Sequence, residues 1–286
     1  MGFKMEVSGF GLEIDLEDLQ GVHIHEETIS SQVEKLERDI RSSDKVRDPV
    51  IVDSDTRVVL DGMHRVAALR KIGCRYLPVC SVDYLNPKVM LKCWNRIIRG
   101  NTWTPKFLDD FRSLGLDIEN STLDEAIKVL DRRVITAAIL TPMNCHLIKT
   151  HGGDTDIKEK FNWVKRLEQI MAREGFSIGY ETESDTAIQV RSGKASAALL
   201  VPTANKEEVV KAALSGNPFA HKTTRHVLPV RPMNVGVPLE WIQGNMSLDE
   251  ADRALVKYLS KRKFEQLPGG SIPDGRRYEE ELVVFR

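Results

Sequence analysis

The stretch PVIVDSDTRVVLDGMHRVAALRKIGCRYLPVCSVDY, residues 49–84, decides the fold of this chain. Two short apolar runs, 50–52 and 58–60, flank a polar turn and predict two strands. Over residues 63–73 the apolar positions recur at helical spacing, and a glycine stands where the helix is expected to end. A further apolar run, 77–82, predicts a third strand. The expected order is therefore strand, turn, strand, helix and strand.

The turn between the second strand and the helix has the composition of an anion site. Backbone N–H groups in the first turn of a helix have no partner within it, and the helix dipole adds partial positive charge there. Gly62 permits close approach to this backbone, and His64 and Arg65 add donors. Such a corner suits a phosphate group. Taken without its flanking strands and helix, the same D-G-x-H-R pattern is equally consistent with a surface turn that carries an ordinary basic residue.

A glutamate lies just ahead of another predicted helix. Apolar residues spaced by three and four predict an amphipathic helix within residues 31–43, with Ser30 as its N-cap. Glu26 therefore stands on a short turn before a helix, where a carboxylate either complements the helix dipole or is available for chemistry. Its neighbour Glu27 is chemically an equal candidate.

A second group of donors follows Pro218. Lys222, Arg225 and His226 are expected to supply positive charge, and Thr223 and Thr224 supply hydroxyl groups, all within five residues. So many donors ahead of an apolar strand favour an anion site. A solvated basic loop is the alternative interpretation of this segment taken alone.

These segments, in this order, resemble the free L-serine kinases of the ParB/sulfiredoxin superfamily. The resemblance rests on the D-G-x-H-R corner at 61–65, the His25-Glu26 pair and the K-T-T-R-H-V-L-P segment at 222–229. Both an archaeal ADP-dependent branch and a bacterial siderophore-pathway branch are similar. The resemblance implies an α+β fold, with a ParB/sulfiredoxin-like nucleotide-binding domain packed on a second small α/β domain.

The resemblance also implies an activity and roles for single residues. The implied reaction transfers a phosphoryl group from ADP or ATP to free L-serine, giving O-phospho-L-serine, with Glu26 rather than Glu27 as general base. Mg²⁺ is expected to bridge the phosphates, because transfer of so highly charged a group needs a cation. Asp61 either orients the turn or touches the metal through water. The implied nucleotide and phosphate contacts are Asp61, Gly62, Met63, His64, Arg65, Thr223, Thr224, Arg225 and His226. The implied L-serine contacts are Trp94, Thr223 and His226.

One position departs from the resemblance, and several choices stay open. Met63 stands where the archaeal branch has a histidine and where sulfiredoxin has its reactive cysteine; a thioether cannot perform thiolate chemistry. A ParB-like, nucleotide-dependent DNA-binding regulator is the alternative function, although the G-E-R-R corner typical of ParB is absent. The residues do not distinguish ADP from ATP, or serine from another small hydroxyl acceptor.

The composition is that of an ordinary soluble protein. Of 286 residues, 41% are hydrophobic and 29% charged, and the formal charge is −1. This balance provides no general field for nucleic acid or an anionic membrane, so nucleic-acid and membrane partners are not expected. No apolar run approaches the ~20 residues that span a bilayer. The four cysteines form no C-x-x-C pair, and a reducing cytoplasm is the expected location.

Three regions are expected along the chain: 1–100, the nucleotide-binding domain; 101–236, an α/β domain; and 237–286, a C-terminal extension. Within the second region, residues 114–142 and 174–202 form a weak internal repeat of strand, short helix and apolar strand.

Several local expectations complete the prediction. Residues 8–24 predict a loop and an edge strand. The glycine-rich segment 151–156 is interpreted as a surface loop rather than a phosphate cradle. In the C-terminal extension an amphipathic helix is expected from Ser247, and the apolar residues 282–285 predict either packing or a homodimer contact.

Overall fold

The computed structural model describes residues 2–150, 155–273, 275 and 277–286, so that most of the predicted 151–156 loop lies outside the described residues. The chain forms two compact units. Unit 1 comprises residues 1–90, 206–221 and 226–286, and unit 2 comprises residues 91–205 and 222–225. These boundaries differ from the expected regions because later segments of the chain return to complete unit 1.

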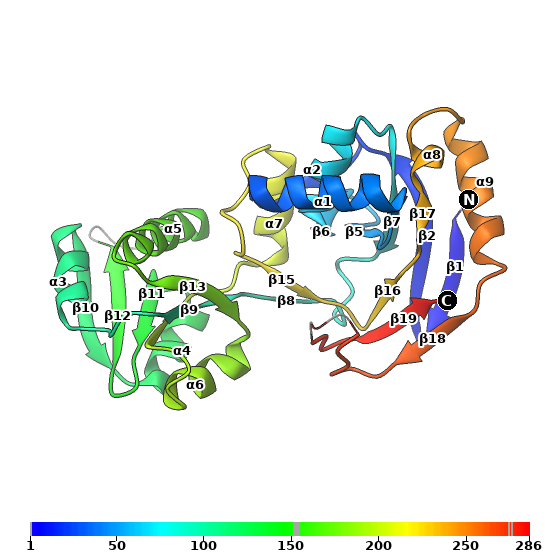
Figure 1. Ribbon diagram of the computed structural model, residues 1–286. Coiled ribbons are helices and arrows are strands. Elements are labelled where there is room, and N and C mark those ends of the chain that lie inside the picture. The colour runs from blue at the N-terminus through cyan, green and yellow to red at the C-terminus, as the bar shows by residue number, and fades with distance from the viewer. Residues whose placement is uncertain (1, 151–154, 274, 276) are drawn as a thin grey trace. The chain divides into compact units, whose positions relative to one another are not determined.

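A six-stranded sheet forms the centre of unit 1, in the order β1-β2-β7-β5-β6-β3 (Figure 1). Its strands are β1 (Phe3–Val7), β2 (Phe10–Asp18), β3 (His23–Ile24), β5 (Val50–Asp53), β6 (Val58–Asp61) and β7 (Tyr76–Val82). The strands expected in the 49–84 stretch are confirmed as β5, β6 and β7. The alternating segment expected as an edge strand within 8–24 is β2, which is not at the edge because β1 pairs with it along its whole length. The edge strand within 8–24 is instead the short β3, at the opposite side of the sheet.

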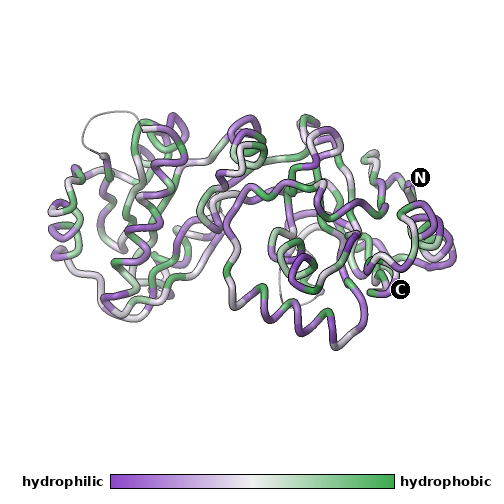
Figure 2. The backbone as a smooth tube through the Cα atoms, turned by 90° about the horizontal axis from the view of Figure 1, so that it is seen from above, coloured by the Kyte–Doolittle hydropathy of each residue, from purple (hydrophilic) through white to green (hydrophobic). Residues whose placement is uncertain are grey.

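Five helices accompany this sheet in the described part of unit 1. They are α1 (Ser30–Ser43), α2 (Met63–Ile72), α7 (Lys206–Leu214), α8 (Leu239–Ile242) and α9 (Leu248–Leu259). The turns of α1 are largely hydrophilic with isolated hydrophobic positions (Figure 2), as expected for a helix that buries one stripe. The N-cap of α1 is Ile29, without a side-chain cap, so the prediction of Ser30 as the cap is wrong.

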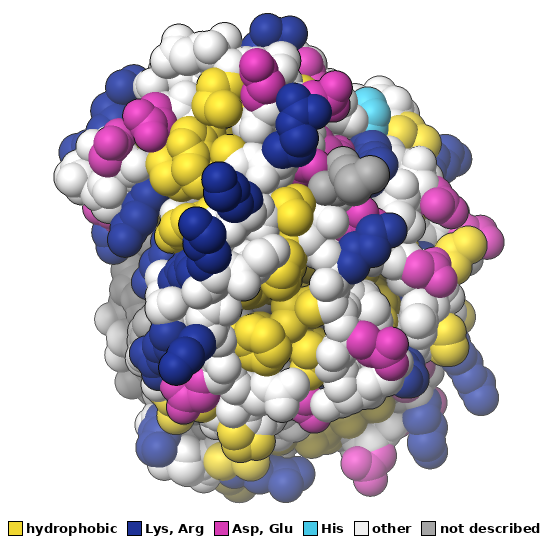
Figure 3. All heavy atoms as spheres, turned by 90° about the vertical axis from the view of Figure 1, so that its right-hand side faces the viewer, with side chains coloured by type: hydrophobic (Ala, Val, Ile, Leu, Met, Phe, Trp, Pro, Cys, Tyr) yellow, Lys and Arg dark blue, Asp and Glu magenta, His cyan; other side chains and the backbone are white. Residues whose placement is uncertain are grey.

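The C-terminal part of the chain adds a small three-stranded sheet to unit 1. It consists of β16 (Val230–Met233), β19 (Glu281–Phe285) and β18 (Phe264–Leu267), while β17 (Val237–Pro238) pairs with β4 (Lys45–Val46). Residues 282–285 are buried within unit 1, so packing explains their apolar character. The face containing α9 and β18 carries a central group of hydrophobic side chains among scattered charges (Figure 3).

Unit 2 is built around another six-stranded sheet, in the order β10-β12-β11-β14-β9-β13. Its strands are β9 (Asn95–Arg99), β10 (Leu116–Ser121), β11 (Ala137–Leu140), β12 (Cys145–Thr150), β13 (Ser177–Glu181) and β14 (Ala197–Leu200). Its helices are α3 (Lys106–Ser113), α4 (Leu123–Asp131), α5 (Ile157–Arg173) and α6 (Glu183–Arg191). The chain crosses between the units within β8 (Met90–Lys92) and β15 (Arg225–Val227), and also between residues 205 and 206 and between residues 221 and 222.

The two segments of the predicted internal repeat form equivalent elements. Each copy forms a strand, a helix and a strand: β10, α4 and β11 in the first, and β13, α6 and β14 in the second. The helices of both copies begin with a threonine N-cap, Thr122 and Thr182, whose side chain accepts from the backbone three residues later. The two copies meet where β11 pairs antiparallel with β14. In the described residues no helix is long and apolar enough to cross a membrane.

Candidate functional site

Glu26 and Asp61 lie at the same edge of the sheet of unit 1. Strand β3 runs parallel to β6, with His23 opposite Val58 and Ile24 opposite Val59. The carboxyl ends of parallel neighbours meet at one edge, where α/β sheets place their ligands. Asp61 ends β6, and Glu26 follows the end of β3. The register therefore brings two distant carboxylates to one edge.

Two helices begin at this same edge. Helix α1 packs against α2, and both start just after the strands that carry the two carboxylates. At the start of α2, Gly62 has a φ of 104°, in the left-handed region that favours glycine. A Cβ there would also come within 3.0 Å of the Arg65 guanidinium. The backbone conformation of the corner therefore favours glycine, and the missing Cβ leaves room for the Arg65 guanidinium.

His64 connects the two helix starts. Its Nε2 accepts a hydrogen bond from the backbone N–H of Ile29, at 3.0 Å. Ile29 is the N-cap of α1, so the ring satisfies one of the backbone donors exposed before that helix. An imidazole nitrogen that accepts a hydrogen bond carries no proton, and this contact therefore describes a neutral ring. In this contact His64 holds the turn that follows Glu26.

Asp61 is held by two arginines. Its Oδ2 accepts from Arg65 Nη2 at 3.0 Å and from Arg231 Nη1 at 2.8 Å. Arg65 also donates through Nη1 to the backbone oxygens of Asp48 and Pro49, at 2.9 and 2.6 Å. Arg65 thus fastens the corner to the start of β5. Arg231 belongs to none of the predicted motifs, although a single arginine inside the apolar run 227–233 indicates that its charge must be compensated.

Glu26 is fixed in a tightly packed segment. The backbone of Phe219 pairs on both sides of it: Phe219 N–H donates to His25 O, and Glu27 N–H donates to Phe219 O, both at 2.8 Å. The Glu26 side chain is 6% exposed, and its Oε1 lies 3.9 Å from His25 Nε2. Glu27 is more exposed than Glu26. Of the two adjacent glutamates, Glu26 is thus the buried one with a defined neighbour.

Two buried histidines lie behind this edge. His25 Nδ1 donates to Val59 O at 2.6 Å, and His226 Nε2 shares a 2.8 Å hydrogen bond with the Tyr84 hydroxyl. The two imidazole rings meet edge to face, with centroids 5.3 Å apart. Burial lowers the pKa of His25, and burial together with His25 lowers the pKa of His226 well below its usual value. The lowered pKa of His226 disfavours the positive charge that was expected at this residue.

In unit 2 the predicted residues gather around Trp94. The guanidinium of Arg225 lies 5.4 Å from the centre of the Trp94 ring, and Lys222 Nζ lies 5.2 Å from it. Arg225 forms a very short ion pair with Glu183 and donates through Nε to Cys93 O at 3.4 Å. Burial opposes ionisation of Glu183, but backbone hydrogen bonds and Arg225 outweigh it and lower its pKa. The positive charges expected at Lys222 and Arg225 thus lie against an aromatic face.

The predicted residues divide between the two units. Unit 1 contains Glu26, Asp61, Gly62, Met63, His64, Arg65 and His226, and unit 2 contains Trp94, Thr223, Thr224 and Arg225. Thr223 and Thr224 are both buried. The contacts described above bring the first group together at the sheet edge and link Trp94 to Arg225.

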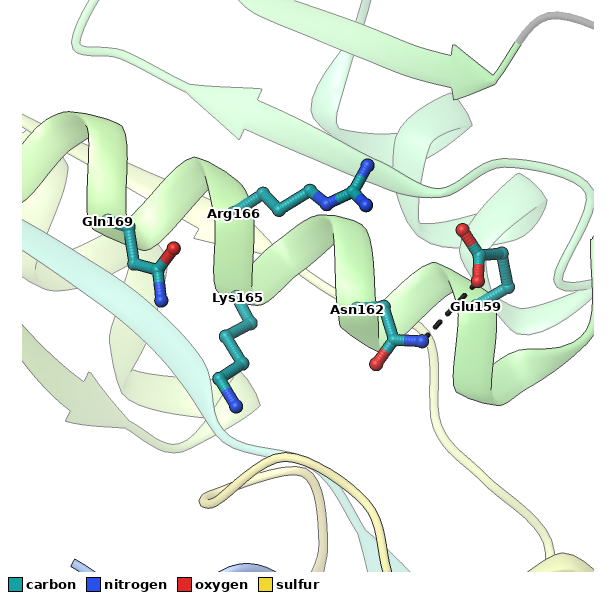
Figure 4. Close-up of a pocket in the computed structure, with 5 residues that line it drawn as sticks. All are labelled: Glu159, Asn162, Lys165, Arg166 and Gln169. Atoms are coloured by element: carbon teal, nitrogen blue, oxygen red, sulfur yellow. Dashed lines mark hydrogen bonds between the residues drawn. The ribbon is translucent and has the colours of Figure 1, made fainter. Parts of the chain in front are cut away.

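A hollow of about 270 Å³ follows one face of α5 in unit 2 (Figure 4). It is lined by Glu159, Asn162, Lys165, Arg166 and Gln169, and Asn162 donates to Glu159 at 3.3 Å. Its lining contains none of the predicted residues and mixes both signs of charge along one helix face. The candidate site is therefore assigned from the motif residues and not from this hollow.

The chain has an α+β fold, and the sheet edge carries a helix start at Gly62 that suits a phosphate group. Both features agree with the class of protein that the motifs predicted. The chain matches no protein-family model. It is 28% identical to an ATP-dependent L-serine kinase of Staphylothermus marinus, over 76% of this chain and 86% of that protein. It is 24% identical to an ADP-dependent L-serine kinase of Thermococcus kodakarensis, over 78% and 90%.

Two further comparisons extend this similarity. A ParB-like protein of Sulfolobus acidocaldarius is 26% identical, over 76% of this chain and 92% of that protein. The solved structure of a free serine kinase in complex with AMP superposes with a TM-score of 0.67 at 23% identity, over 80% of this chain and 93% of that one. The chain is thus similar to L-serine kinases over about three quarters of its length or more, and it has the same fold.

Proposed function

We propose that this protein is a phosphotransferase that moves a phosphoryl group from ATP or ADP to the hydroxyl of free L-serine, giving O-phospho-L-serine. The observation that carries the proposal is the sheet edge shared by β3 and β6. There the buried Glu26 and the N-terminus of α2, which begins after Gly62, lie at the same end of the two strands. Similarity to proteins named ATP- and ADP-dependent L-serine kinases, over most of both chains, supports the substrate class.

The residues of this edge suit each part of the reaction. The backbone at Gly62 and Met63, at the positive end of α2, would bind the transferred phosphate. Glu26 would accept the proton of the serine hydroxyl while that oxygen attacks phosphorus and the bond to the leaving nucleotide breaks. His64 would keep the turn after Glu26 in place.

The remaining predicted residues would bind the two substrates. Thr223, Thr224 and Arg225 would donate to nucleotide phosphates, with Arg225 oriented by Glu183. Trp94 would face the amino acid, and His226 would act as a neutral hydrogen-bonding group because its buried ring has a lowered pKa.

A magnesium ion would fit this site if the substrate phosphates supplied most of its ligands. Among the described residues no group of three or more His, Cys, Asp or Glu side chains is arranged to hold a metal ion. Mg²⁺ commonly binds through substrate phosphates with one or two carboxylates. Here the phosphates would hold it, with Asp61 as the nearest carboxylate of the corner. When bound, the ion would neutralise charge on the phosphates.

The ParB-like regulator has less support than the kinase. One relative is named a ParB-like protein, whereas the others described above are named L-serine kinases. The net charge of −1 offers no general attraction for DNA.

The first test is the reaction itself. Purified protein is incubated with Mg²⁺ and L-serine, with ATP and with ADP in parallel, and O-phosphoserine is measured by mass spectrometry. We expect product with at least one donor and none without serine. Absence of product with both donors would overturn the proposal. L-threonine in place of serine measures the acceptor specificity.

The second test addresses the general base with a matched pair of variants. Glu26→Gln keeps the shape of the side chain but cannot take a proton, so kcat should fall by about 10²–10⁴-fold. Nucleotide binding, measured by calorimetry, should change little. Glu27→Gln is the control and should keep near wild-type turnover. If the two variants turn over equally, Glu26 is not the base.

A further inference from the structure

Arg231 is a buried cation in unit 1 with two carboxylate partners. Its side chain, on β16, is 7% exposed. Nη1 donates to Asp61 Oδ2 at 2.8 Å, and Nε donates to Glu280 Oε1 at 2.6 Å. The Tyr278 ring lies 6.0 Å from the guanidinium carbon. Arg231 thus joins the phosphate corner to a residue near the C-terminal end of the sequence.

The register of the small sheet fixes this arrangement. Strand β19 runs parallel to β16, with Glu281 opposite Val230 and Leu282 opposite Arg231. Glu281 N–H also donates to Pro229 O at 3.2 Å. Glu280 immediately precedes β19, so strand pairing places its carboxylate beside Arg231. Glu280 is itself buried, with a side chain 6% exposed.

The charges of this group balance one another. Arg65 and Arg231 both bond Oδ2 of Asp61, and Glu280 supplies the second negative charge, so that two arginines face two carboxylates. A buried arginine that loses one partner tends to move towards the other, because an uncompensated charge is costly in a poorly solvated site. Burial lowers the pKa of Arg231, but Asp61 and Glu280 together raise it further, so the guanidinium stays charged.

We propose that Arg231 and Glu280 are positioning residues of the phosphate corner, which act on the reaction through Asp61. This inference rests on the proposed function. Glu280 sets the position of Arg231, and Arg231 together with Arg65 sets the orientation and the effective charge of the Asp61 carboxylate. The C-terminal strand is thereby part of the support of the site.

The kinetic test compares conservative variants. Glu280→Gln keeps the size of the side chain, and Arg231→Lys keeps the charge but cannot bond both carboxylates with one rigid fork. Both should lower kcat for O-phosphoserine formation about tenfold, while KM for serine stays within about threefold, because neither residue touches the substrate. The control is Glu265→Gln, which breaks the exposed Arg286–Glu265 pair of the same small sheet and should leave kcat unchanged.

A double-mutant cycle separates positioning from simple loss of stability. In an Asp61→Asn background, Glu280→Gln should lower kcat little further, because its effect passes through Asp61. If Glu280→Gln lowers kcat equally in both backgrounds, or lowers it no more than Glu265→Gln, the inference is wrong.

The same cycle is also measured by urea unfolding, which needs no activity. We expect a coupling between Asp61→Asn and Glu280→Gln of about tenfold in the unfolding equilibrium constant, since both contact Arg231. No O-phosphoserine from the wild-type protein would reject the proposed function alone. In that case an unfolding coupling would support the Asp61–Arg231–Glu280 linkage, and additive unfolding effects would overturn it.

Discussion

At the scale of single residues, His64 has a contact that a charged ring could not make. Its Nε2 accepts from Ile29 N–H at 3.0 Å, at the N-cap of α1. The D-G-x-H-R pattern predicted a side chain that donates to phosphate, and the structure adds a second role as the acceptor for the Ile29 N–H. Sequence alone could not give this role, because Ile29 and His64 meet only when β3 and β6 pair.

A pair of variants tests this hydrogen bond. His64→Ala removes the acceptor and should lower the free energy of unfolding by about 1 kcal/mol, the usual net contribution of one hydrogen bond. His64→Gln places an amide oxygen at a similar reach and should recover most of that loss. Urea unfolding measures both. Equal destabilisation by the two variants would show that the ring does not act as the acceptor.

Buried partners were the least predictable part of the candidate site. The motifs indicated Glu26, Asp61 and Arg65 because these residues stand at strand ends and helix starts. Arg231 and Glu280 have no local signal of that kind, and their role follows from strand pairing between distant segments. Neutral His226 was missed for the same reason, since the sequence does not reveal that its ring is buried against His25.

At the scale of secondary-structure elements, the contact between β2 and α9 contains closely spaced carboxylates. Asp15 on β2 is half-buried, and its Oδ1 has no hydrogen-bond partner. Asp252 on α9 is buried and accepts from Leu16 N–H at 3.2 Å. Burial first, and then Glu17, Asp252 and Glu13, raise the pKa of Asp15 to about 7, while Arg57 opposes the shift.

This shift gives a prediction with a definite sign. Between pH 4 and 7 the unfolded chain releases a proton that folded Asp15 retains, so this residue reduces stability progressively as the pH rises through that window. Asp15→Asn should therefore raise the melting temperature at pH 8, and the gain should shrink towards pH 4. Glu6→Gln, an exposed site on the neighbouring strand, is the control. A gain independent of pH would contradict the prediction.

Elements with strong local patterns were the most predictable part of the fold. The repeat in unit 2 was recognised because each copy has its own acidic turn, helix and proline-ended strand, and all of these are local signals. Strand β12, which lies between β10 and β11, was not predicted. The position of β2 inside its sheet was also not predicted. Its pairing with β1 depends on both segments together, and neither segment alone indicates it.

At the scale of the whole molecule, each unit has a hydrophobic core of its own. One cluster of buried side chains in unit 2 lies between the sheet and helices α4 and α6. In unit 1, Leu282 belongs to a separate cluster with Met233 and Tyr278. The expected boundaries at 100 and 236 differ from those of the units, because composition marks linkers but not segments that return to an earlier sheet.

Two leucine variants test the independence of these cores. Leu282 in unit 1 and Leu167 in unit 2 are both fully buried. Replacing either by alanine should cost about 2–5 kcal/mol. Hydrogen exchange read by mass spectrometry should show faster exchange mainly in peptides of the unit that carries the substitution. Equal acceleration in both units by either variant would indicate a single cooperative structure.

The pairing of β16 with β19 also has a consequence for synthesis of the protein. Asp61 leaves the ribosome well before Glu280, and at about 5–20 residues per second the delay between them is roughly ten to forty seconds. During that interval Arg231 emerges without its second carboxylate partner. The nascent chain can form the first sheet early, but the anion-binding corner reaches its final electrostatic state only when translation has passed Glu280.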